Sequence, residues 1–160
     1  MSVDANVFAP EWDVEMPDLG RRVMRLGGRV GSSELGASLF EIDPGGAVSP
    51  MHIHHANAEL LFVLSGRPRL DTREGSRELE PGAVVAFPRG LAGAHRIAND
   101  GPAAARVIVV STMNKPEVTE LVSTGTLMVS ASGDTRKVFA ADSAQDFLSL
   151  WREAFDVDRS

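Results

Sequence analysis

Three of the four histidines in this chain stand almost together, as His52, His54 and His55. In a β-strand, side chains two positions apart project from the same face, so we expect His52 and His54 to lie side by side and His55 to point away. A neutral imidazole is a common ligand of metal ions in proteins. A lone His-x-His pair is equally compatible with surface or hydrogen-bonded histidines, so further ligands are needed to indicate a metal site.

Two further side chains complete a ligand set, Glu59 and the fourth histidine, His95. Glu59 opens the apolar run ELLFVL, where a buried carboxylate is costly unless a cation compensates its charge. His95 follows a separate Gly/Pro turn, which suits a ligand from a neighbouring strand. The sequence therefore predicts one divalent metal ion bound by His52, His54, Glu59 and His95. This ligand set suits Fe, Mn, Ni or Zn, and also Co or Cu, with a position left open for water or substrate.

The composition excludes several other kinds of site. There is no cysteine, which rules out disulfides, zinc fingers, iron–sulfur clusters and thiol catalysis. The formal net charge is −6 and the basic residues are scattered, so a nucleic acid is not an expected partner. No stretch approaches the ~18 apolar residues of a membrane span, and the first residues lack the apolar core of a signal peptide. We expect a cytoplasmic protein with no membrane partner.

Short apolar runs separated by Gly/Pro turns occupy residues 36–110 and predict a β-sandwich or barrel. The runs are ELGASLFEI, AELLFVL, RLDT, AVVAF, HRIAN and ARVIVVST, with turns such as DPGG, SGRP, REGS, PRG and DGP between them. No helical pattern alternates with these strands, which argues against a parallel α/β sheet. Pro10 and Pro17 interrupt the first part of the chain, which we expect to be irregular.

The run ELLFVL is apolar on both faces. Glu59, Leu61 and Val63 share one face, and the residues between them lie on the other. A strand covered on both faces lies inside a sandwich or beneath a partner subunit. Together with the exposed sheet edges, this pattern favours a homodimer, in which residues 7–30 can add a strand to the neighbour's sheet.

The tail has a different periodicity. Apolar residues in DSAQDFLSLWREAF fall at a helical spacing, at Phe147, Leu150, Trp151 and Phe155. We predict one amphipathic helix over residues 143–156, capped by Asp142 or Ser143 and packed on the barrel through this stripe. The segment 113–140 has two interpretations, a lid over the site or an extra hairpin.

Both halves of the candidate site resemble the two sequence motifs of the cupin superfamily. The first motif reads Gly46, AVSPM, His52-Ile53-His54, HANA, Glu59, LLFVLS, Gly66, and the second reads Gly82, AVVAF, Pro88-Arg89-Gly90, LAGA, His95, RIA, Asn99. The spacer LAGA before His95 is longer than in the common pattern, which lengthens one turn. The resemblance implies that His52, His54, Glu59 and His95 hold the metal, whereas His55 lies outside the ligand shell and Asn99 bonds a turn.

The resemblance also implies the fold, an all-β double-stranded β-helix, or jelly-roll cupin barrel, with one C-terminal α-helix. We divide this single domain into three parts. Residues 1–34 are an N-terminal arm with edge strands, residues 35–112 are the barrel core, and residues 113–160 add further strands and the helix.

Cupins carry many functions on one barrel, so the fold alone does not name a reaction. This short chain looks similar to sugar-phosphate-isomerase-like cupins, which implies a small metalloenzyme, an isomerase or a dioxygenase, acting on a small polar substrate. The alternatives are a non-catalytic module that binds or senses a small sugar-like molecule, and a storage role, which would need none of the four ligands.

A phosphate group on the substrate would need a basic partner near the metal. The candidates are Arg67, Arg69, Arg89 and Arg96. Arg96 follows His95 directly, so along a strand it points away from the metal, and the first two follow a turn glycine and are expected to face solvent. The rest of the pocket lining is expected to be apolar, from Leu39, Met51, Leu61, Val63, Phe87 and Ile97.

Overall fold

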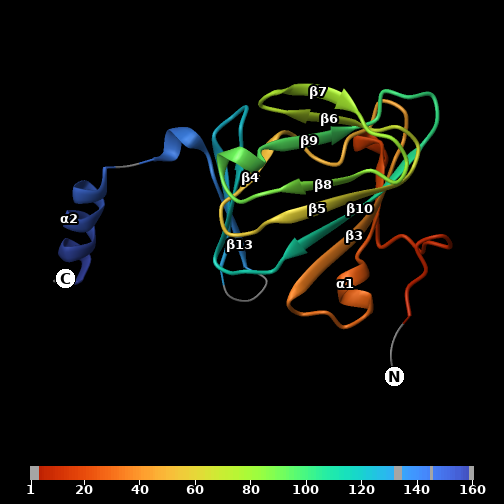
Figure 1. Ribbon diagram of the computed structural model, residues 1–160. Helices are drawn as coiled ribbons and strands as arrows, with labels where there is room; N and C mark the ends of the chain where they lie inside the picture. The colour runs from red at the N-terminus through yellow and green to blue at the C-terminus, as the bar shows by residue number, and fades with distance from the viewer. Residues whose placement is uncertain (1–3, 132–134, 145, 159–160) are drawn as a thin grey trace.

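The computed structural model describes residues 4–131, 135–144 and 146–158, and in them the strands form two antiparallel sheets (Figure 1). The six-stranded sheet runs β1 (Val14–Met16), β2 (Arg21–Met24), β3 (Leu35–Ile42), β10 (Ala105–Thr112), β5 (Glu59–Ser65) and β8 (Val84–Phe87). The seven-stranded sheet runs β13 (Arg136–Phe139), β12 (Thr126–Ser130), β11 (Glu117–Leu121), β4 (His52–His54), β9 (His95–Ala98), β6 (Arg69–Thr72) and β7 (Gly75–Glu78).

The main core lies between the two sheets, as the alternation of apolar residues predicts. In β5, Leu61 and Val63 are buried, whereas Leu60, on the opposite face, is 42% exposed. The inward residues of both sheets pack into one cluster: Ile42, Val48, Leu61, Val63, Leu70, Leu79, Phe87, Ile97 and Val107. The predicted fold, an all-β jelly-roll barrel with one C-terminal helix, is confirmed.

The N-terminal arm covers part of the outer face of the six-stranded sheet. Met24 and Leu26, the latter in the short helix α1 (Leu26–Arg29), pack with Leu39 of β3, and Trp12 lies against them. β1 and β2 pair in register with β3 of the same chain. Within one chain, β2 thus occupies the edge of β3, and the expectation that residues 7–30 add a strand to a neighbour's sheet stays a prediction.

The described parts of the segment 113–140, residues 113–131 and 135–140, form a meander rather than a lid. β11 pairs with β4, β12 with β11, and β13 with β12, so the segment extends the sheet that carries the histidines. In this register Thr119 lies opposite His54 and Leu121 opposite His52. The meander is therefore one wall of the site. Of the two interpretations of this segment, the extra hairpin is the nearer one, with a third strand added.

The C-terminal helix exists but differs from the prediction in its start and its packing. α2 spans Phe147–Asp158, and Ala141–Ser143 form a 3₁₀ turn (η3) before it. The cap is Asp146, whose Oδ2 accepts a hydrogen bond from the main-chain N–H of Ser149 at 3.0 Å.

The helix stands apart from the barrel (Figure 1). Trp151 is 53% exposed and Phe147 60%, and these two rings contact each other, 5.0 Å between centroids. The prediction that the stripe packs on the barrel of the same chain is therefore wrong for these two residues, and Phe155 lies outside the described side chains. No helix in the described part of the chain is long and apolar enough to cross a bilayer.

Candidate metal centre

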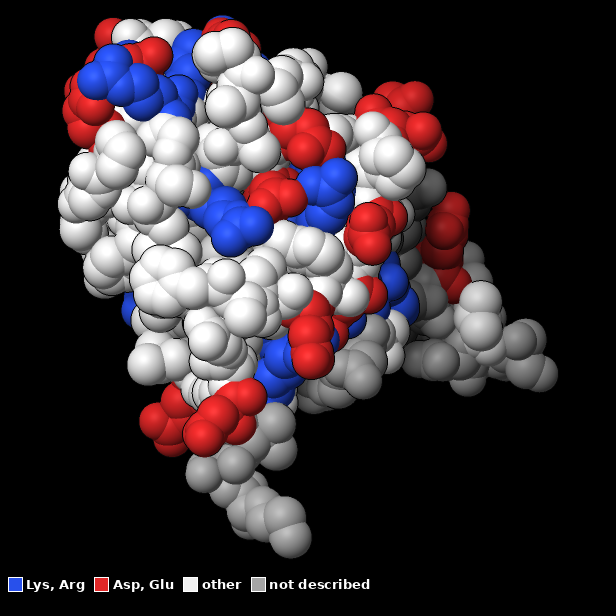
Figure 2. All heavy atoms as spheres, turned by 90° about the vertical axis from the view of Figure 1, so that its right-hand side faces the viewer, with Lys and Arg blue, Asp and Glu red and all other residues white. Residues whose placement is uncertain are grey.

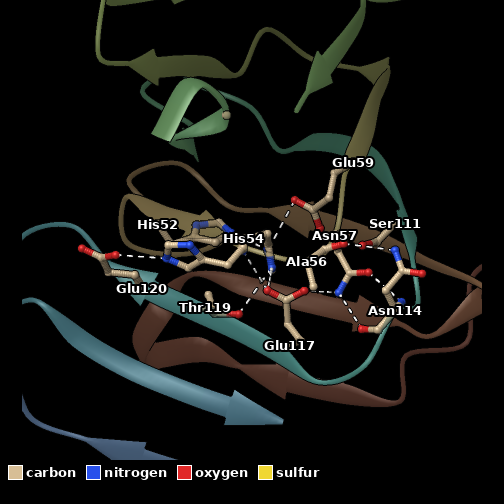
Figure 3. A network of polar contacts seen from close by, with 12 residues as sticks. His52, His54, Ala56, Asn57, Glu59, Ser111, Asn114, Glu117, Thr119 and Glu120 are labelled. Atoms are coloured by element: carbon tan, nitrogen blue, oxygen red, sulfur yellow. Dashed lines mark hydrogen bonds and ion pairs between the residues drawn. The ribbon is translucent and has the colours of Figure 1, made fainter. Parts of the chain in front are cut away.

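Strand β4 presents its two histidines to the space between the sheets, together with the first residue of β5 (Figure 3). His52, His54 and Glu59 each place one ligand atom within 4.8 Å of the others. Nε2 of His54 lies 3.1 Å from Nε2 of His52 and 3.5 Å from Oε2 of Glu59. Spacing along one strand and the start of the next therefore brings these three predicted ligands together.

His95 joins them from β9, the strand beside β4. It lies directly opposite His52 in the antiparallel register, and the two rings are 4.6 Å apart between centroids. Its Nε2 is 3.5 Å from Oε2 of Glu59. The ring stacks flat on Phe87 of β8, with 3.6 Å between centroids and 6° between planes. All four predicted ligands thus meet at one place, although the tightest cluster comprises only the first three.

In His52 and His95, the hydrogen-bond partner of Nδ1 determines which ring nitrogen carries the proton. Nδ1 of His52 lies 3.0 Å from the carbonyl oxygen of Pro50, and Nδ1 of His95 lies 2.9 Å from that of Gly93. A carbonyl only accepts, so in the neutral ring each Nδ1 carries the proton and each Nε2 keeps its lone pair. That is the form in which imidazole binds a metal ion.

Burial shifts the pKa values of His52, His95 and Glu59 towards the neutral form of each side chain. Burial lowers the pKa of His95 to about 4, and burial, followed by repulsion from His54, also lowers the pKa of His52. Burial raises the pKa of Glu59 above its usual value, although neighbouring His54 opposes the shift. Nε2 of His52 and Nε2 of His54 lie 3.1 Å apart beside a desolvated carboxylate, and a cation among these groups would bind the nitrogens and compensate the charge of Glu59. The donor set therefore fits a divalent metal ion.

The long spacer before His95 has a structural role. Leu91–Gly93 form a 3₁₀ turn, η2, and it is the carbonyl of Gly93 that holds Nδ1 of His95. A Cβ on Gly93 would lie 1.8 Å from the carbonyl oxygen of Pro88, so only glycine fits. The insertion thus leaves the ligand in place, as predicted, and also supports it. Asn99 is buried and bonds the Ile42 and Ala103 carbonyls and the N–H of Gly101, in keeping with its predicted turn role.

A cavity of about 1410 Å³ opens beside the four residues. Its walls come from β4, β9, β11, β12 and the inner face of β10, with β1 and β2 at one side. Of the six apolar residues expected to line it, only Ile97 does so. Leu61, Val63 and Phe87 belong to the main core, and Leu39 lies beneath the N-terminal arm, because β3 turns that residue to the outer face.

The arginines proposed for a phosphate group are engaged elsewhere or exposed. Arg67 pairs with Glu78 and Glu80, and Arg69 pairs with Asp71 and Asp100. On the face shown in Figure 2, basic and acidic side chains lie against one another in this way, rather than in separate patches.

The other two candidates, Arg89 and Arg96, are also poorly suited to bind an anion in the cavity. Arg96 borders the cavity but bonds Asp71 at 3.0 Å, and Arg89 is exposed and does not line the cavity.

Sequence reasoning missed a different arginine, Arg21 of β2, which lines the cavity. Its Nη2 lies 3.2 Å from the sulfur of Met16, and it has no carboxylate partner in the described part of the chain. Burial lowers the pKa of its guanidinium below the usual value. A half-buried cation without an acid beside it is suited to an anionic ligand. No sequence motif marks Arg21, because its approach to the site depends on the pairing of β2 with β3.

Comparison with known proteins agrees with this geometry. Residues 38–111 match the sequence family described as a cupin domain. No curated protein matches the chain. Residues 38–111 therefore form a cupin domain, whose strands lie in the two antiparallel sheets with the histidine cluster between them.

Two solved structures are similar over most of their length. A protein from Silicibacter pomeroyi, described as a sugar phosphate isomerase from a cupin superfamily, is 26% identical with a TM-score of 0.73, covering 81% of this chain and 82% of that one. A protein from Acidithiobacillus ferrooxidans, provisionally described as a sugar phosphate isomerase, is 27% identical with a TM-score of 0.73, covering 82% and 83%. The polyketide cyclase RemF from Streptomyces resistomycificus shares the fold at 24% identity, with a TM-score of 0.53 over 61% of this chain and 69% of that one.

Proposed function

We propose that this protein is a metal-dependent cupin enzyme that acts on a small polar substrate, most closely in the manner of a sugar phosphate isomerase. The observation that carries the proposal is the convergence of His52, His54, Glu59 and His95 at the wall of a large cavity. The similarity to two proteins described as sugar phosphate isomerases supports the reaction class.

The four residues would hold the ion, and a divalent ion in such a site acts as a Lewis acid on a carbonyl or hydroxyl oxygen. The chain itself supplies the rest. Arg21 is placed to bind an anionic group of the substrate inside the same cavity. Val109 and Ile97 give the cavity apolar walls, which remove water from around a bound ligand and strengthen each polar contact within.

The first experiment is elemental analysis of wild-type protein alongside His54→Ala and the matched control His55→Ala. His55 has the same chemistry, but its Nε2 faces Glu120 at 3.1 Å, outside the cluster. We expect near-equimolar metal in the wild type and in His55→Ala, and little in His54→Ala. Empty wild-type protein, even after loading with Fe, Mn, Ni or Zn, would overturn the metal site.

The second experiment tests turnover. Metal-loaded protein is assayed on a panel of sugar phosphates, keto acids and diols, with and without oxygen, and His54→Ala serves as the inactive control. Isomerisation of a sugar phosphate supports the proposal, whereas consumption of oxygen would assign a dioxygenase instead. Saturable binding of a sugar-like ligand with no turnover would replace the enzyme by a binding or sensing module.

A further inference from the structure

A second carboxylate, Glu117 of β11, lies beside His54, near Asn57 and Thr119 (Figure 3). It lies outside the segment that matches the cupin domain, and its side chain is 10% exposed. A buried carboxylate of this kind is retained only where its charge is compensated by hydrogen bonds or by a cation.

Both oxygens of Glu117 accept hydrogen bonds. Oε1 accepts from the main-chain N–H of His55 at 3.1 Å, and Oε2 accepts from the side-chain amide of Asn57. The amide cannot turn round, because its Oδ1 already accepts from the N–H of Asn114 at 2.7 Å and from the hydroxyl of Thr112 at 3.0 Å. Glu117 is therefore held as an acceptor on both sides, which the ionised carboxylate satisfies and a side-chain amide does not.

The held carboxylate faces one ring nitrogen of one candidate ligand. Oε1 of Glu117 lies 3.5 Å from Nδ1 of His54, and the hydroxyl of Thr119 lies 3.3 Å from the same atom. The opposite nitrogen, Nε2, faces His52 and Glu59. A negative oxygen beside Nδ1 favours the ring form with its proton on Nδ1 and its lone pair on Nε2.

The other two histidines have the same support from a different source. Nδ1 of His52 and Nδ1 of His95 face the main-chain carbonyls of Pro50 and Gly93. The hydroxyl of Ser49 also lies 3.0 Å from Nδ1 of His52. Among the three histidines, His54 is thus the one whose far nitrogen faces a carboxylate, which brings a negative charge. With Glu59 it would give the centre two carboxylates, matching the charge of a divalent ion.

We propose that Glu117 is a positioning residue of the metal centre, holding His54 with Nε2 towards the ion and adding a negative charge behind it. This inference rests on the proposed metal site. It makes the β11 meander part of the metal-binding machinery, with the chain Asn114–Asn57–Glu117–His54 linking the loop before β11 to the site.

The test compares Glu117→Gln with Glu120→Gln, a carboxylate of the same strand that contacts only His55 among the histidines. The dissociation constant for Zn(II) is measured by competition with a chelator, and the metal-free unfolding midpoint is measured alongside. Loss of a partner that orients a metal ligand typically costs ~10–100-fold in affinity. We expect a loss of this size in Glu117→Gln and less than about a twofold change in Glu120→Gln.

The outcomes distinguish failure of the proposed metal site from failure of the proposed role of Glu117. Wild-type protein that binds neither Zn(II) nor Fe, Mn or Ni would end the proposed function, and tight Zn(II) binding by wild type and Glu117→Gln alike would end this inference alone. The Co(II) absorption spectrum should also change in Glu117→Gln and not in Glu120→Gln. Should Glu117→Gln fail to fold, nitrogen-15 NMR of metal-free wild type decides: a proton on Nδ1 of His54 supports the inference, and a proton on Nε2 contradicts it.

Discussion

Each imidazole of the centre is oriented by an acceptor on its far nitrogen, so the ligand geometry depends on residues that touch no ion. Pro50, Gly93 and Glu117 provide these acceptors from three different segments. Such partners set which nitrogen is free and where it points. The site is therefore already arranged for an ion before one binds, and binding should need little rearrangement.

Arg21 gives a prediction for ligand recognition at the residue scale. A charge-assisted hydrogen bond to a buried anion contributes about 1.5–3 kcal/mol, so Arg21→Met should weaken binding of an anionic ligand by roughly 10–100-fold. The probe is inorganic phosphate, titrated calorimetrically into metal-free protein. Arg67→Gln is the matched control, since Arg67 pairs with Glu78 and Glu80 away from this cavity. Equal affinity in all three proteins would remove Arg21 from the ligand site.

The residues of the site differ in how far the sequence could predict them. His52, His54 and Glu59 could be grouped because they are close in the chain and strand alternation fixes their faces. Glu117 and Arg21 could not, because their position depends on pairings between distant strands, β11 with β4 and β2 with β3. Among the candidate arginines, Arg67 and Arg69 were expected to face solvent, whereas the pairing of Arg96 with Asp71 could not be foreseen because Asp71 lies on another strand.

Among the elements, the strands with long apolar runs could be predicted from the sequence. β5 is apolar on both faces after Glu59, as a strand inside a sandwich should be, and its inward residues Leu61 and Val63 are indeed buried. β11 reads EVTEL, with two glutamates in five residues, and only the site explains why Glu117 is buried in it. α2 was predictable from its periodicity, but no local pattern says what covers its apolar stripe.

The η2 turn supports a prediction at the element scale. Gly93→Ala would place a Cβ 1.8 Å from the carbonyl oxygen of Pro88, and relieving that clash must move the carbonyl that holds His95. We expect a loss of about 1–3 kcal/mol in the free energy of unfolding, measured with urea on metal-free protein, and reduced metal content after loading.

Gly28→Ala is the control for this change, since Gly28 is an exposed residue of α1 with nothing within 4 Å of its added Cβ. It should be neutral or stabilise the protein by up to about 1 kcal/mol, as expected for alanine in a helix. If Gly93→Ala were as stable and as well loaded as Gly28→Ala, η2 would not support the site in the way described.

At the scale of the whole molecule, the outer face of the six-stranded sheet is covered only in part. The N-terminal arm packs over β3, against Leu39 and Leu64. Beyond it, Leu60 of β5 is 42% exposed and Val84 of the edge strand β8 is 58% exposed. Phe62 lies opposite Val84 across the two strands, so these side chains form one apolar surface.

A second copy of the chain, packed through the same surface on both protomers, would cover these residues in the way that a symmetric dimer requires. We predict a homodimer by sedimentation velocity, and a monomer for Leu60→Glu, because a charge buried at the centre of an apolar interface is strongly unfavourable. Val138→Glu should remain dimeric, since Val138 is 63% exposed on β13, in the other sheet. A monomeric wild type would contradict the prediction. Dimers from all three proteins would place the contact on another face. The next surface to test by a substitution to glutamate is then the exposed apolar stripe of α2.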